Sequence, residues 1–166
     1  MTSHTGAETG HDASSASLTI RDATEADLPA IVALYANDTL GATRERVEDP
    51  LPEPYRVAFA EISEDPRARL VVVEADGEIV GTLQLNVIPH VVRLGAKRAQ
   101  IESVRVAASH RGSGVGQRMI TWAIEEARRN GCALVQLTTD ASRKDAHRFY
   151  ERLGFVPSHI GMKLML

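Results

Sequence analysis

The feature that most constrains the fold of this chain is a glycine-rich loop, Arg111-Gly112-Ser113-Gly114-Val115-Gly116. The alternating apolar run 101–106 before it predicts a strand, and the amphipathic run 117–130 after it predicts a helix. Glycines allow a tight turn and a close approach to a ligand, and the free N–H groups of a first helical turn attract anions. This order of strand, loop and helix therefore predicts an α/β unit with a phosphate or pyrophosphate site.

The spacing of the glycines limits the kinds of ligand that the loop could bind. A phosphate loop of the NTPase type requires GxxxxGK followed by Ser or Thr, and no Lys follows these glycines. The dinucleotide fingerprint GxGxxG requires glycine at position 117, where Gln117 stands. The remaining pattern, Arg-x-x-Gly-x-Gly, resembles the acetyl-CoA pyrophosphate loop of the GCN5-related N-acetyltransferase (GNAT) family, although an ordinary strand-to-helix turn also explains three glycines.

A second block, 146–155, reads AHRFYERLGF. It resembles the other signature of the same family, a helix that carries Phe-Tyr and closes in Gly-Phe. The resemblance covers residues 18–166 and implies acetyl transfer from acetyl-CoA to the amine of a small molecule, by direct attack in a ternary complex. Two alternatives stay open: a non-catalytic acyl-CoA-binding sensor or scaffold, and acetylation of a protein or peptide amine.

Length and composition bound the remaining possibilities. The chain has 166 residues, a net charge of -3 and 43% hydrophobic residues, which predicts one domain over 17–166 and no generic nucleic-acid binding. Residues 1–16 have almost no large apolar side chain and predict a disordered leader. The single cysteine, Cys132, excludes an intramolecular disulfide and a Cys-based zinc site, and no metal site is predicted. Without a run of membrane-spanning length or a signal peptide, we expect a cytoplasmic protein that does not bind membranes.

Hydrophobic periodicity predicts an α/β fold, which the resemblance specifies as a mixed central sheet of about six to seven strands flanked by about four helices. Thr24 followed by Asp27 resembles a capping box, and Asp76-Gly77 is a hairpin turn. An abbreviated C-terminal sheet would leave an edge to be covered, so we expect a homodimer. The predicted strands are 18–21, 69–74, 79–85, 99–106, 133–139 and 160–166, and the predicted helices are 24–40, 55–64, 114–130 and 143–152.

Glu102 is the candidate general base. An alkyl amine with a pKa near ~10 must lose a proton before it attacks, and Glu102 is the only carboxylate of the strand before the loop. An ion pair of Glu102 with Arg105 or Arg98 is the structural alternative. Regular alternation places Glu102 on one face with Val104 and Val106, unless a bulge resets the register.

The resemblance assigns further roles. It implies that Tyr150 protonates or hydrogen-bonds the leaving thiolate, with core packing as the alternative, and that the Val104 N–H stabilises the oxyanion. Arg143 stands where many members of the family carry Asn, and supplies a cation for a cofactor phosphate or for an anionic acceptor. Eight acidic residues between positions 38 and 65 would instead favour a cationic amine, unless they form a solvated helix face. The implied acetyl-CoA contacts are Val104, Arg105, Val106, Arg111, Gly112, Ser113, Gly114, Val115, Gly116, Gln117 and Arg143.

Overall fold

The computed structural model describes residues 17–38 and 41–166, so the predicted leader 1–16 lies outside the described residues. Within this part of the chain, no helix combines the length and the apolar character needed to cross a bilayer. The strands are β1 (Leu18–Asp22), β2 (Ala68–Ala75), β3 (Glu78–Ile88), β4 (Lys97–Val106) and β5 (Cys132–Leu137). The helices are α1 (Leu28–Ala36), α2 (Glu53–Glu64), α3 (Val92–Gly95), α4 (Val115–Arg129) and α5 (Lys144–Arg152), with 3-10 turns at Glu25–Asp27 and Ala108–His110.

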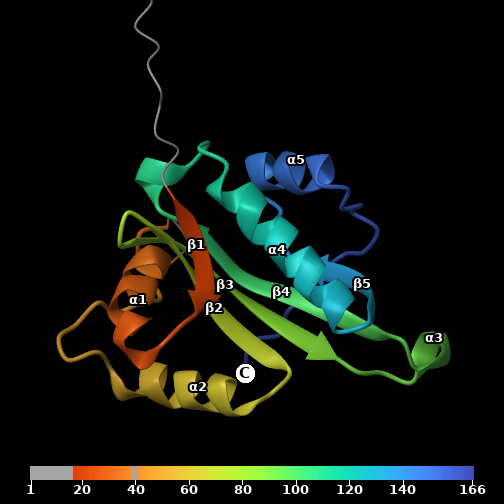
Figure 1. Ribbon diagram of the computed structural model, residues 1–166, viewed down its shortest axis with the longest axis horizontal. Coiled ribbons are helices and arrows are strands. Elements are labelled where there is room, and N and C mark those ends of the chain that lie inside the picture. Colours follow the sequence, from red (N-terminus) through yellow and green to blue (C-terminus); the bar gives the residue numbers. More distant parts are fainter. Residues whose placement is uncertain (1–16, 39–40) are drawn as a thin grey trace, which may run out of the picture.

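The strands form one mixed sheet in the order β1-β2-β3-β4-β5 (Figure 1). Neighbouring strands are antiparallel except β4 and β5, which are parallel and joined through α4. This confirms the predicted α/β fold, but the prediction of six to seven strands is wrong, because the described residues form five.

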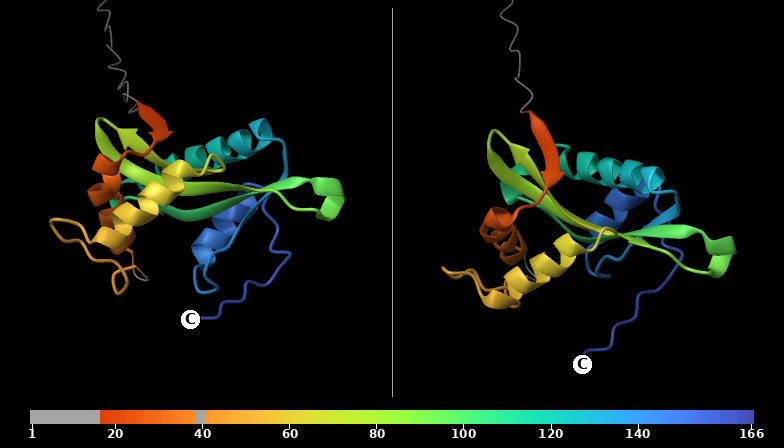
Figure 2. Two further views of the ribbon diagram at one scale, coloured as in Figure 1. Left: turned by 90° about the horizontal axis from the view of Figure 1, so that it is seen from below. Right: turned by 60° about the horizontal axis from the view of Figure 1, so that its bottom comes forward.

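The missing strand is the predicted one at 160–166, which is extended but pairs with no other strand. A Cβ placed on Gly161 would lie 3.8 Å from Cγ2 of Thr138, one residue beyond the end of β5. The tail therefore passes the carboxyl end of β5 instead of running along its edge, and Figure 2 shows it leaving the body of the molecule.

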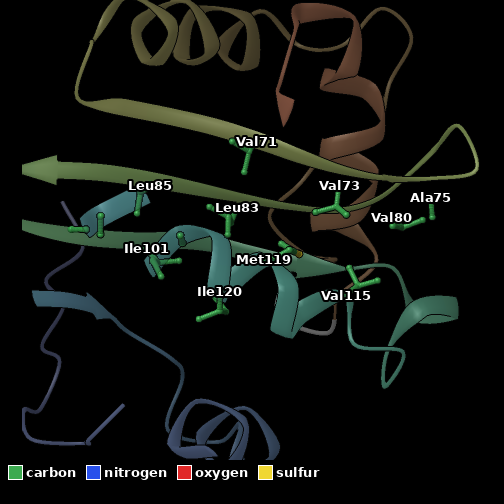
Figure 3. Packing of buried hydrophobic residues seen from close by; sticks show 13 residues of the cluster. Val71, Val73, Ala75, Val80, Leu83, Leu85, Ile101, Val115, Met119 and Ile120 are labelled. Atoms are coloured by element: carbon green, nitrogen blue, oxygen red, sulfur yellow. The ribbon is translucent and has the colours of Figure 1, made fainter. Parts of the chain in front are cut away.

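Two apolar layers cover the two faces of the sheet. On one face α4 presents its apolar stripe to β2, β3 and β4, and Figure 3 shows Val115 and Met119 beside these strands. Ile120 is buried in the same layer. On the other face α2 packs on β2 and α1 lies mainly over β3 and β4, and Ile31, Leu70 and Val72 are buried there. Figure 2 shows α4 on one side of the sheet and α1 and α2 on the other. The first layer contains Val71, Val73, Ala75, Val80, Leu83, Leu85, Ala99, Ile101, Val115, Met119, Ile120, Ala123 and Ala127.

The structure confirms the local sequence signals for the hairpin turn and for the helix cap. Asp76 and Gly77 have φ of 51° and 84°, the left-handed values that a two-residue hairpin requires. The Thr24 N–H donates to Oδ2 of Asp27 at 2.7 Å, as in a capping box. The helix that follows ends at Ala36, before its predicted end at Leu40, and Leu40 lies outside the described residues.

Candidate active site

A bulge in β4 decides which face each site residue occupies. Thr82 of β3 pairs with Arg105 and Gln84 pairs with Glu102, so two residues of β4, Ser103 and Val104, oppose one residue of β3. Ser103 adopts a φ of 55°, which is unusual for a residue with a side chain. The extra residue reverses the alternation for the second half of the strand.

The side chains of β4 therefore segregate differently from a regular strand. Val104 and Val106 pack on the layer under α4, together with Ile101, whereas Arg105 faces α1. The predicted common face of Glu102, Val104 and Val106 is wrong, and the bulge named as the exception is present. As a result Glu102 and Arg105 lie on the same side of the sheet.

Glu102 is oriented by amide side chains. Nε2 of Gln100 donates to Oε1 of Glu102 at 2.8 Å, and Nε2 of Gln136 on β5 donates to Oε1 of Gln100 at 2.5 Å. The alternative ion pair with Arg98 or Arg105 is not formed among the described residues, and Arg105 pairs with Asp38 instead. Glu102 is thus a half-buried carboxylate that accepts a hydrogen bond from one neutral amide, which a second amide holds in turn.

Tyr150 lies on α5 within a small aromatic cluster. Its ring meets Phe149 edge-on at 5.1 Å and Phe155 at 5.8 Å between ring centroids. Burial raises the pKa of the Tyr150 hydroxyl, while the nearby positive charges of Arg105 and Arg143 act in the opposite direction. The hydroxyl therefore stays protonated at neutral pH and can donate a proton or a hydrogen bond.

Three charged side chains from distant parts of the sequence meet beside Tyr150. Oδ2 of Asp38, just after α1, accepts from Nη2 of Arg105 at 3.4 Å and from Nη2 of Arg143 at the start of α5. The Arg105 guanidinium also lies over the ring of Tyr35, 5.8 Å from its centroid. We call Asp38, Arg105 and Arg143 the charged cluster.

The glycine loop forms an open cradle at the start of α4. Gly112 and Gly114 have φ of 80° and 89°, and a Cβ at either would meet nothing within 4 Å. No side chain caps α4, and the first N–H that bonds back is that of Arg118, to the Gly114 carbonyl at 3.0 Å. The three preceding N–H groups therefore point into the loop with the positive end of the helix dipole, which fits a pyrophosphate.

Two hollows adjoin these residues. A surface groove of about 860 Å³ runs from Ser113 and Gly114 along α4 to Leu18 and Ile20 of β1. Neither Glu102 nor Tyr150 lines this groove, which lies on the α4 face of the sheet. A smaller cavity of about 130 Å³ lies between the sheet and helices α1 and α2, and it is lined by Tyr35, Tyr55, Phe59, Gln84 and Ser103 among others. Glu102 and Tyr150 do not line this cavity either, but Gln84 is the cross-strand neighbour of Glu102, so the cavity lies on the face of the sheet that carries the candidate base.

A protein-family comparison matches residues 29–155 to the Acetyltransferase (GNAT) family. The chain belongs to this family. The match spans the strand, loop and helix of the cradle as well as α5, so it covers both motifs on which the resemblance was based.

Relatives of this acetyltransferase include enzymes that act on small molecules. It is 34% identical to the aminoalkylphosphonate N-acetyltransferase of Salmonella typhimurium, over 64% of this chain and 69% of the relative. It is 32% identical to the L-methionine sulfoximine/L-methionine sulfone acetyltransferase of Pseudomonas aeruginosa, over 84% of this chain and 80% of the relative. Among solved structures, a protein of Bacillus halodurans C-125 described as a transcriptional regulator shares 49% identity with a TM-score of 0.88, over 90% of this chain and 100% of that one.

The fold of the acetyltransferase brings several predicted site residues together. Arg105 and Arg143 join one cluster with Tyr150 beside it, and Glu102 lies on the Arg105 side of the sheet. The loop residues form a second group at the start of α4. The two groups touch where a Cβ on Gly116 would lie 3.4 Å from Cζ of Phe149, the neighbour of Tyr150.

Sequence reasoning missed Asp38, Tyr35 and the amides of Gln100 and Gln136. Asp38 stands 67 residues before Arg105 and 105 residues before Arg143, and no local pattern connects them. The acidic stretch that contains Asp38 was expected to favour a cationic acceptor, but several of its carboxylates pair with nearby arginines, such as Glu53 with Arg56. The sequence held one signal for these amides. Gln100 and Glu102 are two residues apart in a predicted strand, so their side chains are expected on the same face.

Proposed function

We propose that this acetyltransferase moves the acetyl group of acetyl-CoA to the amine of a small molecule by direct attack in a ternary complex. The observation that carries the proposal is the open glycine cradle at the uncapped start of α4, directly after the bulged strand. The cradle suits the pyrophosphate of acetyl-CoA, and β4 pairs with β5 only as far as Ile101, so the backbone of 104–106 pairs with no strand on that side among the described residues. Relatives with named small-molecule acceptors support the choice of acceptor class.

In this proposal the chain contacts acetyl-CoA through two segments. The backbone of 104–106 pairs with the pantetheine arm, and the cradle holds the pyrophosphate. Arg111 and Gln117 are exposed at the cradle, where a cation and an amide would meet phosphate oxygens. The cradle residues are Arg111, Gly112, Ser113, Gly114, Val115, Gly116 and Gln117.

The transfer step conserves atoms and charge as follows. Glu102 accepts a proton from the ammonium group of the acceptor, directly or through water, and the free amine attacks the thioester carbonyl carbon. The Val104 N–H stabilises the oxygen of the tetrahedral intermediate. As the intermediate collapses, the carbon–sulfur bond breaks and the nitrogen gives up its remaining extra proton to water, which leaves the neutral amide. The Tyr150 hydroxyl hydrogen-bonds the departing thiolate, or protonates it and then regains a proton from water.

The alternative is a protein that binds acyl-CoA as a sensor or scaffold and transfers nothing. One observation favours it, the 49%-identical Bacillus halodurans protein described as a transcriptional regulator. The two proposals differ in a single measurement, because both expect acetyl-CoA binding and only the enzyme releases coenzyme A in the presence of an amine.

The test combines calorimetric titration with acetyl-CoA and a free-thiol assay over a panel of small amines and one lysine-containing peptide. We expect micromolar to millimolar affinity and amine-dependent thiol release at about 1–1000 s⁻¹, the ordinary range for enzymes. Tight binding without thiol release for every amine would favour the sensor, and release only with the peptide would move the acceptor to a protein amine.

We also propose that the chain forms a homodimer, an expectation that the C-terminal tail supports. The edge of β5 away from β4 pairs with no strand among the described residues, and the tail carries exposed Ile160, Met162, Leu164 and Leu166. Such an apolar edge and tail are unusual on a monomer surface. Sedimentation equilibrium of the full chain and of a form ending at residue 158 tests this, with loss of the dimer expected only for the shortened form. The cytoplasmic location stays a prediction that cell fractionation can check.

A further inference from the structure

The charged cluster is built from three elements and contains more positive than negative charge. Asp38 follows α1, Arg105 belongs to β4 and Arg143 precedes α5. The Asp38 side chain is 7% exposed, whereas those of Arg105 and Arg143 are 26% and 32% exposed. One buried carboxylate thus holds two arginines that still reach solvent, and the three side chains together carry a charge of +1.

The arginines of the cluster also have donors in excess of the acceptors that they meet. Each guanidinium has five N–H donors. Arg105 uses Nη1 on the Val104 carbonyl at 2.8 Å and Nη2 on Asp38, and its Nε is buried without an acceptor among the described residues. The N–H groups of Arg105 and Arg143 that these bonds leave unused fit the oxygens of a phosphonate, phosphate or carboxylate, which Arg binds in bidentate fashion.

The cluster also lies at the place where an acceptor would have to sit. Arg105 and Arg143 both act electrostatically on the Tyr150 hydroxyl, so they lie near the group that is proposed to hydrogen-bond the departing thiolate. The bulge places Arg105 on the face of Glu102, and the guanidinium covers Tyr35, a wall of the 130 Å³ cavity.

We propose that the acceptor of this enzyme is a small amine that carries an oxyanion, and that Arg105 and Arg143 bind this oxyanion while the amine faces Glu102. The inference rests on the proposed function and adds the chemical class of the acceptor. Asp38 acts as the positioning residue, because its one carboxylate accepts hydrogen bonds from both guanidinium groups.

The experiment compares three acceptors of similar length: 2-aminoethylphosphonate, 3-aminopropanoate and the neutral 3-amino-1-propanol. Thiol release measures kcat/KM for each, with acetyl-CoA saturating. We expect kcat/KM for the better of the two anionic amines to exceed that for the neutral amine by at least about 30-fold. Comparison of the phosphonate with the carboxylate shows which oxyanion the site prefers.

Arg143→Met is the decisive variant, because it removes one guanidinium and keeps an apolar stem. We expect it to lower kcat/KM for the anionic amines by about 10- to 100-fold, mainly through KM, and to leave the neutral amine within about 2-fold. Arg148→Met is the matched control, since Arg148 is an exposed arginine of α5, the helix that Arg143 precedes, and it pairs with Asp145. Arg105→Lys keeps the positive charge but not the planar fork of the guanidinium, so we expect it to lose less kcat/KM for the anionic amines than Arg143→Met.

Three results would overturn the inference while the transferase stands: a neutral amine used as well as the anionic ones, an equal loss for all acceptors in a folded Arg143→Met, or a loss confined to acetyl-CoA binding. If no amine is acetylated, the proposed function fails instead. Calorimetric titration of 2-aminoethylphosphonate into the coenzyme A complex then decides the inference alone, with binding by the wild type but not by Arg143→Met supporting it and equal or absent binding overturning it.

Discussion

Tyr150→Phe tests the chemistry of the site with the smallest possible change, because it deletes one oxygen and keeps the ring. The ring supplies the edge-on contacts with Phe149 and Phe155, and these contacts survive in the variant. We therefore expect the free energy of unfolding to change by less than about 1 kcal/mol, since no packing volume is lost. Any large change in rate then belongs to the hydroxyl.

The size of the rate change follows from the acidities involved. A thiol with a pKa near ~8.5 is a stronger acid than a phenol with a pKa near ~10, and burial raises the pKa of Tyr150 further. Full proton transfer from tyrosine to thiolate is therefore uphill by at least about 2 kcal/mol. The hydroxyl contributes chiefly as a hydrogen-bond donor that strengthens as charge builds on sulfur, which corresponds to about 10- to 1000-fold in kcat.

The assay is steady-state thiol release with the best amine of the panel, beside calorimetric affinity for acetyl-CoA in the same preparation. We expect kcat to fall within that range while the affinity changes by less than about 3-fold. Phe155→Leu is the packing control, because it disturbs the same aromatic cluster and leaves the hydroxyl. Full activity in Tyr150→Phe would refute the acid role and make Tyr150 a core residue, and a loss confined to affinity would make it part of the cofactor wall.

Three further predictions concern the base, the cradle and the stability of the N-terminal turn. In Glu102→Gln, thiol release should fall about 10- to 100-fold at pH 7 and recover as the pH approaches the pKa of the amine, because the free amine then no longer needs a base; a wild-type pH profile would remove Glu102 from the mechanism. Gly114→Asp should weaken acetyl-CoA binding at least about 10-fold by calorimetry, since a carboxylate enters a loop with φ of 89°, whereas Gly77→Asp at φ of 84° strains a distant turn and should leave the affinity unchanged. Hydrogen bonds from Arg21 hold the pKa of the Asp27 carboxyl well below its usual range, so this pair stabilises the fold above about pH 4 and the contribution is lost as the pH falls. Urea unfolding of Asp27→Asn should show about 1–3 kcal/mol lower stability at pH 7 and a smaller decline between about pH 5 and 3, and an unchanged acid slope would contradict this account.

The parts of the fold that local chemistry determines could be predicted from the sequence. The glycine loop, the helix after it and the Asp76-Gly77 turn depend on residues within one or two turns of each other, and the structure has them within two residues of their predicted bounds. The cradle could be predicted for the same reason, because all of its residues are consecutive.

The parts that depend on distant contacts could not be predicted. Whether Ser103 bulges is decided by its partner on β3, and regular alternation gives the opposite face for Val104. The ion pairs of Asp38 with Arg105 and Arg143 form between segments that are far apart in the sequence, and no sequence pattern connects these segments. The prediction of a last strand at 160–166 was wrong because apolar alternation predicts an extended chain but does not determine which strand it pairs with.

The bulge at Ser103 also limits how this sequence can change over time. Substitutions in either half of β4 can be accepted independently, because each half has its own neighbours. A deletion of one residue between Glu102 and Arg105 would only remove the bulge, because a single residue would then oppose Leu83 and Arg105 would stay opposite Thr82, on the face of Glu102. A deletion in a regularly paired part of β4 is different, since it would turn one half of the strand over. Relatives with other acceptors should therefore differ mainly by exchanged side chains around this strand, and a one-residue difference in its length should fall at the bulge.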